Sequence, residues 1–477
     1  MLKKIFVLLY LKRILIYKER NAIMAKDTTK RLTTGKPMSL ILGFSLPLLV
    51  GMLFQQFYSL VDTIIVGKFL GVDALAAVGS TGAINFLIIG FCMGVCSGFA
   101  IPVAQRFGAG DYESLRKYVA NSVWLCLIFS AVMTLIVSVF CRQILELMQT
   151  PSNIIDQAYS YIFIIFVGIP VTYLYNITSG IMRSLGDSKT PVYFLLLASG
   201  INIVLDLIFI TQIGMGVEGA GYATVISQFI SGISCLIYMK AKFPILKMQP
   251  GEWAWNGHCV ATLCHMGVPM GLQYSITAIG SVILQAAVNN LGSNAVASIT
   301  AANRISMFIV CPFDALGSTM ATYGGQNVGA MELGRVKEGL KSATILGLCY
   351  AIIAFFVLLF AGKYLLLLFL STNETAIIAD ARTFLLIQSC FYFPLALVNI
   401  VRFLIQGMGF SIFAILAGVM EMLARSIVAF SLVPAIGFLG ACFASPFAWI
   451  MADVFLIPAF FHVHKKLQKK FAAHIAI

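Results

Sequence analysis

The sequence predicts an all-α integral membrane protein with about twelve membrane-spanning helices. Hydrophobic residues make up 60% of its 477 residues, charged residues make up 11%, and the mean hydropathy is +0.94. A soluble domain has about 25% charged residues. Apolar segments of about 20 to 30 residues recur along nearly the whole chain, which is the length that a helix needs to cross the hydrocarbon core. A membrane β-barrel would instead show strict alternation of apolar and polar residues.

Polar, Gly-rich and Pro-rich breaks divide the chain into these spans, with boundaries that are soft by several residues. The spans are expected to begin near Met38, Val78, Asn121, Ile155, Pro191, Gly219, Cys259, Ala297, Ala343, Ile377, Ser411 and Gly440.

Basic residues set the expected orientation. They gather in alternate connections and in the C-terminal tail: Arg106, Arg116, Lys117, Arg183, Lys189, Lys240, Lys242, Lys247, Arg335, Lys337, Lys341, Lys465, Lys466, Lys469 and Lys470. By the positive-inside rule these connections and both termini lie in the cytoplasm, which agrees with an even number of spans. The expected location is the plasma (inner) membrane of a bacterium. The net charge of +13 is explained by loops that face anionic headgroups, so no nucleic-acid partner is inferred.

The first twenty residues mix basic residues with short apolar runs. They resemble neither a spanning helix nor a signal peptide. Either they lie on the membrane surface or translation starts at Met24, and the sequence leaves both readings open.

An internal repeat predicts two six-helix bundles. GVDALAAVG (71–79) resembles GSNAVASIT (292–300), QRFGAGD (105–111) resembles QNVGAME (326–332), and GVEGAGYA (216–223) resembles GFLGACFA (437–444), all at an offset of 221 residues. Six spans per repeat give both bundles the same orientation, as in many secondary transporters. The expected organisation of a monomer is a basic cytoplasmic segment (1–38), an N-lobe (39–241), a cytoplasmic loop (242–258), a C-lobe (259–462) and a cytoplasmic tail (463–477).

Two acidic residues inside N-lobe spans are the candidate site. Asn202 and Asp206 are four residues apart, so they share one face of the fifth helix. In the first helix, Gln55, Tyr58 and Asp62 form a polar stripe at helical spacing. An acid in the hydrocarbon core is costly unless it faces a partner, water or an ion. Carboxylates bind Na⁺ or exchange a proton, with help from amide and hydroxyl oxygens.

Other features of the spans carry weaker hypotheses. Pro47 lies inside the first helix, where it removes a backbone donor and should weaken or bend the helix. Glu421 and Arg425 are also four apart, and a structural ion pair is the favoured reading. Asp314 and Asp453 are isolated acids that either line a cavity or face water, and their roles stay open.

Four segments together resemble the MATE (multidrug and toxic compound extrusion) transporters. They are FSLPLLVGMLFQQFYSLVDTIIVGKFLG, QRFGAGD, SGIMRSLGDSKTPVY and NIVLDLIFI, and the resemblance extends from about residue 38 to 462. It is closer to the DinF-like branch than to the NorM-like branch, whose acids in the seventh and tenth helices are missing here: the seventh helix offers Gln273, Thr277 and Gln285. The resemblance implies a cation site at Asp62, Asn202, Asp206 and Thr224, and a bend of the first helix at Pro47.

The favoured function is therefore a secondary antiporter, not an enzyme. It would export organic, cationic and lipophilic compounds in exchange for H⁺ or Na⁺, with no cofactor besides the coupling ion. An alternative of related fold is a flippase or exporter of a lipid-linked or other endogenous substrate. An intramembrane aspartyl enzyme is disfavoured, because the sequence has no GxGD or DDxxD motif and such an enzyme does not explain the repeat.

Overall fold

The structure is a computed structural model that describes residues 29–370 and 373–475, and the regular structure within them is entirely helical. The N-lobe helices are α2 (Pro37–Leu70), α3 (Val72–Ser80), α4 (Gly82–Ala109), α5 (Tyr112–Val139), α6 (Cys141–Leu147), α7 (Ile155–Val167), α8 (Ile169–Ser184), α9 (Thr190–Leu207), the π-helical turn η1 (Ile208–Gln212) and α10 (Val217–Lys242). After the 3₁₀ turn η2 (Pro244–Leu246), the C-lobe contains α11 (Gly257–Asn289), α12 (Ser293–Gly329), α13 (Leu333–Leu366), α14 (Thr375–Cys390), α15 (Tyr392–Gly407), α16 (Ile412–Phe430), α17 (Leu432–Ile436) and α18 (Phe438–Ile475).

The predicted all-α membrane fold is confirmed. Ten helical segments in the described part of the chain are long and apolar enough to cross a membrane, and there are twelve spans if each of two bent helix pairs counts as one. The helices α7 and α8 meet at 46°, and α14 and α15 meet at 53°. Pro170 lies in the first turn of α8, where its missing N–H costs no helical hydrogen bond. The chain can therefore restart a helix in a new direction after Gly168.

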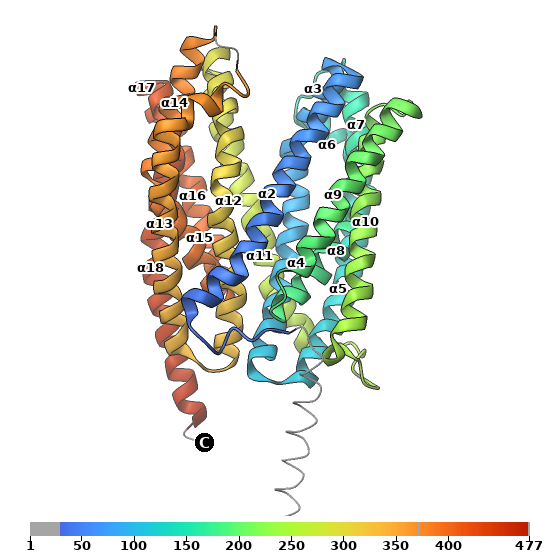
Figure 1. Cartoon of the computed structure of the whole chain (residues 1–477), viewed down its shortest axis with the longest axis vertical. Coiled ribbons are helices and arrows are strands. Elements are labelled where there is room, and N and C mark those ends of the chain that lie inside the picture. Colours follow the sequence, from blue (N-terminus) through green and yellow to red (C-terminus); the bar gives the residue numbers. More distant parts are fainter. Residues whose placement is uncertain (1–28, 371–372, 476–477) are drawn as a thin grey trace, which may run out of the picture.

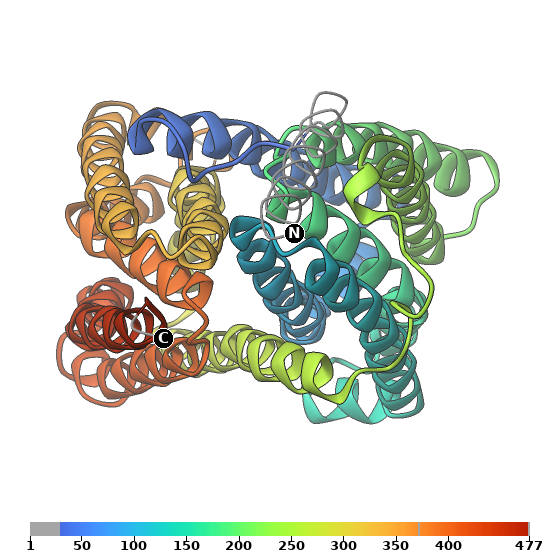
Figure 2. The same cartoon turned by 90° about the horizontal axis from the view of Figure 1, so that it is seen from below.

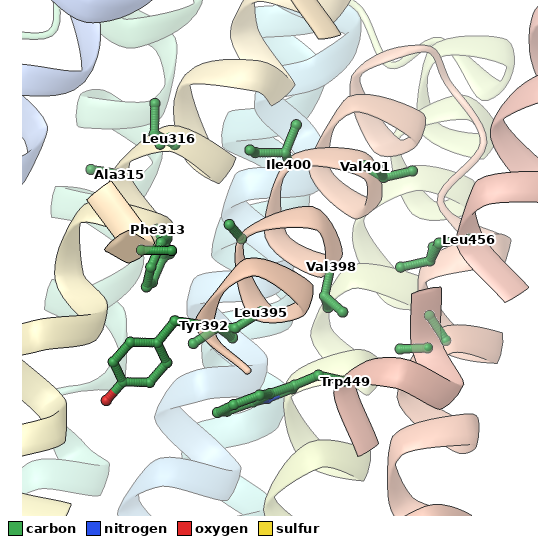
Figure 3. Packing of buried hydrophobic residues seen from close by; sticks show 14 of the residues in the cluster. Phe313, Ala315, Leu316, Tyr392, Leu395, Val398, Ile400, Val401, Trp449 and Leu456 are labelled. Carbon is green, nitrogen blue, oxygen red and sulfur yellow. The ribbon is translucent and has the colours of Figure 1, made fainter. Parts of the chain in front are cut away.

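Each lobe has its own apolar core. The C-lobe core includes Phe313, Tyr392 and Trp449 (Figure 3). The Phe313 and Tyr392 rings meet edge to face with their centroids 5.8 Å apart, a favourable aromatic arrangement. In Figure 1 the ribbons of the two lobes lie close together at the bottom and diverge toward the top.

Two long helices run from one lobe to the other. Ile41 and Phe44, near the start of α2, pack in the C-lobe core, whereas Ile65 and Val66, near its end, pack in the N-lobe core. The helix α11 does the reverse: Gly267 and Gly271 in its first half lie against α4, and Gly280 in its second half lies against Met422 of α16. Figure 2 shows α2 and α11 along opposite edges of the molecule, each spanning both lobes. A change in the angle between the lobes must therefore move or bend these two helices.

The lobes touch backbone to backbone at the end of the molecule where α4 and α12 terminate, which we call the closed end. A Cβ atom on Gly108 of α4 would lie 1.9 Å from the carbonyl oxygen of Gln326, and a Cβ atom on Gly329 of α12 would lie 1.9 Å from the carbonyl oxygen of Gln105. Only glycine permits an approach this close.

Candidate functional site

The candidate site is built from α2, α7, α9 and α10 of the N-lobe. Asp62 lies in the second half of α2, and Asp206 is the penultimate residue of α9, where its side chain is fully buried. The π-helical turn η1 begins two residues after Asp206. Such turns widen a helix locally and occur frequently at functional sites.

The structure places the two acids opposite each other. The carboxyl groups of Asp62 and Asp206 lie within hydrogen-bonding reach of one another. Ionised carboxylates are acceptors only, so they can share a hydrogen bond only when one of them carries a proton. Within the described residues, Oδ1 of each acid is buried and has no hydrogen-bond partner. Asp206 is buried and Asp62 is partly buried, and two close acids with buried, unpaired oxygen atoms need a proton or a cation between them.

Asn202 and Thr224 complete the group that the sequence predicts. Nδ2 of Asn202 lies 3.5 Å from Oγ1 of Thr224. With the amide turned over, Nδ2 of Asn202 donates to Oδ2 of Asp206 at 3.3 Å, and its oxygen accepts from the backbone N–H of Thr224 at 3.3 Å. With its amide turned over, Asn202 thus connects Asp206 on α9 with Thr224 on α10.

Two tyrosines lie close to the acids. Tyr58 lies one turn before Asp62 on α2, and Tyr161 lies on α7, with both phenol groups within electrostatic range of Asp62 and Asp206. Tyr58 belongs to the polar stripe predicted from the sequence. Tyr161 was missed, because the segment IDQAYSYIFIIFV gives no reason to single out one of its two tyrosines.

The other predicted residues of α2 lie outside this group. The side chain of Gln55 is exposed. Pro47 lies fifteen residues before Asp62, one residue before Leu48, which packs in the C-lobe core. The helix continues through Pro47 without interruption from Pro37 to Leu70.

These oxygens suit either a proton or Na⁺. No group of three or more His, Cys, Asp or Glu side chains that could hold a metal ion occurs in the described part of the chain. The amide oxygen of Asn202 and the hydroxyl of Thr224 would therefore have to complete a Na⁺ site around Asp62 and Asp206, since hard cations take several oxygen ligands.

A second polar group lies inside the C-lobe. Glu421 on α16 pairs with Arg402 on α15 and, at 3.5 Å, with Arg425 on its own helix, and all three side chains are buried. The buried acid Asp453 on α18 lies near Arg402 and Glu421, so it does not face water. Asp314 on α12 accepts a hydrogen bond from Nδ2 of Asn399 at 3.2 Å. The predicted pair of Glu421 and Arg425 is present, but Arg402 was missed because it comes from another helix.

Comparisons with known proteins agree with this architecture. The chain matches the MatE family profile over residues 47–208 and 269–431, once in each lobe. It is 31% identical over 343 residues to "Probable multidrug resistance protein YoeA" of Bacillus subtilis (strain 168), covering 70% of this chain and 74% of that protein. It is 26% identical over 372 residues to a protein named "FAD transporter" of Shewanella oneidensis, covering 76% of this chain and 80% of that protein.

Among solved structures, an outward-facing MATE transporter of the MOP superfamily superposes with a TM-score of 0.86 and 24% sequence identity, covering 91% of this chain and 98% of that one. This likeness extends over both lobes and supports the two-lobe fold.

Proposed function

Because the chain belongs to the MatE family of membrane transporters and is therefore not an enzyme, we propose that it is a multidrug efflux antiporter. It exports lipophilic organic compounds, cationic ones among them, in exchange for inward movement of Na⁺ or H⁺. The facing pair of Asp62 and Asp206 is the observation that carries the proposal, because two close carboxyl groups, each with a buried oxygen that has no hydrogen-bond partner among the described residues, form a site for a coupling cation.

The proposed coupling runs through α2. This helix holds Asp62 in the N-lobe, and its first half packs against the C-lobe. Loading of Asp62 and Asp206 with a proton or Na⁺ removes the repulsion between them and changes how α2 packs against α9. Pro47, which leaves one helical carbonyl without its usual donor, supplies the point where α2 bends. The coupling ion can shift the lobes only by binding the two conformations with different affinity.

The closed end is assigned to the cytoplasm, together with both chain termini, in the plasma membrane of a bacterium. This assignment is supported by the basic connections and by the likeness to an outward-facing transporter. One chain holds both lobes, so a monomer is sufficient for transport. No cofactor beyond the coupling ion is required.

An exporter of an endogenous compound is the second candidate. One observation favours it: the relative from Shewanella oneidensis is named as a transporter of FAD, which is an endogenous and anionic compound. The two candidates share the same coupling site and differ only in the compound that the lobes enclose.

The test is efflux from proteoliposomes containing purified protein, with Na⁺ and pH gradients imposed separately and a fluorescent organic cation as the probe. Asp206→Asn and Asp62→Asn should each abolish gradient-driven efflux, since each removes a charge that binds the coupling ion. Asp73→Asn is the matched control, because Asp73 is exposed on α3. Thermal unfolding should show that all three variants are folded.

Full gradient-driven efflux by Asp62→Asn or Asp206→Asn would remove that residue from the coupling site. If wild-type protein moves no probe under either gradient, export of organic cations is wrong and the second candidate is favoured.

A further inference from the structure

Arg183 lines a pocket between the lobes. The pocket lies just inside the closed end and is lined by residues of both lobes. Among them are Arg183 on α8, Met270 and Tyr274 on α11, Ser318 and Thr322 on α12, and Phe403 on α15. The positive-inside pattern placed Arg183 in a connection, but it lies in the last turn of α8. Its guanidinium is therefore available to the interior of the transporter.

The pocket is positively charged. The residues that line it, all within the described ranges, include Arg183 and no acidic residue. No acidic side chain of residues 29–370 and 373–475 forms an ion pair with Arg183. The other arginines that pack inside the protein differ, because Arg402 and Arg425 both pair with Glu421. An inward-facing cation without a counter-charge is costly, and a bound anion would offset this cost.

The neighbouring side chains suit an aromatic compound with an acidic group. The pocket volume is about 70 Å³, and a single water needs about 10–15 Å³, so a carboxylate or phosphate fits but a whole drug-sized compound does not. Hydroxyls of Ser318 and Thr322 can donate to an acid, whereas Phe403 and Met270 offer apolar surface to the adjoining ring system.

An acidic group also lies near Tyr274. Tyr274 is within electrostatic range of Asp314, Arg402 and Arg183. Asp314 lies one helical turn from Ser318 on α12, away from the closed end, and its side chain is exposed. Arg183 at the inner end of the space between the lobes and Asp314 further out along α12 are thus both near Tyr274, and Asp314 is also near Arg402.

We propose that Arg183 binds the carboxylate or phosphate group of the exported compound, so that organic compounds with an acidic group are substrates. The inference rests on the proposed export function and names a substrate class for it. A bidentate guanidinium contact to an acidic group is short, directional and strong. A cationic group on the same compound would lie toward Asp314.

The experiment uses two matched fluorescent probes. Rhodamine 110 carries a free carboxyl group, and rhodamine 123 is its methyl ester, so the pair differs in one acidic group on the same cationic ring system. Binding to purified protein is measured by fluorescence polarisation, and efflux is measured in proteoliposomes. Wild-type protein should bind and export the acid. Arg183→Gln should weaken binding of the acid at least about tenfold, because one charge-assisted contact is lost, and should leave binding of the ester within about twofold.

Two control variants define the interpretation. Arg183→Lys keeps the charge and should restore part of the binding of the acid. Arg142→Gln removes an arginine on α6 that is paired with Glu146 and Asp156 outside the pocket. This variant should bind both probes as wild-type protein does. If Arg183→Gln weakens binding of both probes equally, or of neither, the proposal is overturned and Arg183 is a structural residue.

Binding measurements test the Arg183 pocket, and efflux measurements test the antiport function. Arg183-dependent binding of the acid without gradient-driven efflux of either probe would support the pocket and contradict the antiport function. Efflux of both probes that does not depend on Arg183 would support the antiport function and contradict the pocket.

Discussion

Glu421 is held between two arginines, one on each side, in the interior of the C-lobe. Removing its charge with Glu421→Gln leaves Arg402 and Arg425 without the carboxylate that pairs with both of them, although Asp453 stays near Arg402. The expected loss of stability is about 3–5 kcal/mol, the usual effect of removing one partner from a buried ion pair. Thermal unfolding of the purified variant, compared with Glu374→Gln on the surface before α14, measures this loss.

Exchange of the two residues distinguishes a pair from a triad. If only Glu421 and Arg425 interacted, the double variant Glu421→Arg with Arg425→Glu would restore stability. Because Arg402 also pairs with Glu421, the exchange places two arginines against each other, and we expect the variant to remain destabilised. Recovery of the wild-type unfolding temperature would show that Arg402 contributes little.

Single residues also show what the sequence could predict. Spacing within one helix placed Asn202 beside Asp206 and Glu421 beside Arg425, because helical periodicity is a local property. The approach of Asp62 to Asp206 and of Arg402 to Glu421 depends on how separate helices pack, which local spacing does not contain. The positive-inside rule predicted that Arg183 lies in a cytoplasmic connection, and it did not predict that Arg183 faces the space between the lobes.

At the scale of elements, the predicted span starts agree with the observed helix starts to different degrees: those near Asn121 and Ala343 lie nine and ten residues after helices that begin at Tyr112 and Leu333. The expected starts near Met38, Ile155 and Pro191 lie within one residue of helices that begin at Pro37, Ile155 and Thr190. The breaks inside the fourth and tenth spans were not predicted. A proline in the first turn of a helix is ordinary, so Pro170 alone does not show that two helices meet at an angle, and the bend is fixed by tertiary packing.

The connection between the lobes is docked on α5. Glu252 accepts hydrogen bonds from Nε and Nη2 of Arg116, both at 2.7 Å. Oδ1 of Asn121 accepts from the backbone N–H of Asn256 at 2.9 Å, and Nε1 of Trp124 donates to the carbonyl of Trp253 at 3.1 Å. The connection is thus fixed to the N-lobe, and α11 starts from a defined position.

This docking predicts a pH dependence. The hydrogen bonds from Arg116 hold the pKa of Glu252 below its usual value of 4.5. A group with a depressed folded-state pKa stabilises the fold above its unfolded pKa, and this contribution is lost as the pH falls through the folded-state value. We therefore expect the unfolding temperature of wild-type protein to decrease as the pH is lowered below about 4.5. Glu252→Gln should lower stability at pH 7 by about 1–3 kcal/mol and weaken the acid dependence. If the unfolding temperature of this variant decreases at acidic pH as much as that of wild-type protein, other carboxyl groups cause the decrease.

At the scale of the whole molecule, the repeat predicted from the sequence gives a reciprocal contact between the lobes. Nε2 of Gln105 donates to the carbonyl of Gly407 at 2.9 Å, and Nε2 of Gln326 donates to the carbonyl of Ser184 at 2.8 Å. Gln105 and Gln326 are 221 residues apart, which is the offset of the repeat. Each lobe thus donates an amide hydrogen bond to the end of a helix in the other lobe.

The segment that precedes α2 reinforces this contact. The backbone N–H of Leu32 donates to Oε1 of Gln326 at 2.8 Å, and the backbone N–H of Lys30 donates to the carbonyl of Leu185 at 3.0 Å. Nη2 of Arg335 donates to the carbonyl of Gly35 at 2.9 Å. The segment is bonded to both lobes, so opening of the closed end must break its bonds to at least one of them.

The glycines beside these glutamines give the sharpest test of the closed end. A methyl group at Gly108 or Gly329 would lie 1.9 Å from a backbone oxygen of the other lobe, a distance that no side-chain rotation relieves. We expect Gly108→Ala and Gly329→Ala each to fold within their lobes, to separate the lobes at this end and to abolish gradient-driven efflux. Hydrogen exchange should rise in residues 100–110 and 321–329. The double variant should be little less stable than either single variant, because both substitutions disrupt one shared contact and effects within such a contact are not additive.

Gly200→Ala is the matched control, since a Cβ atom there meets nothing within 4 Å. Wild-type efflux by Gly108→Ala, with amide protection unchanged at both helix ends, would show that transport does not require this contact.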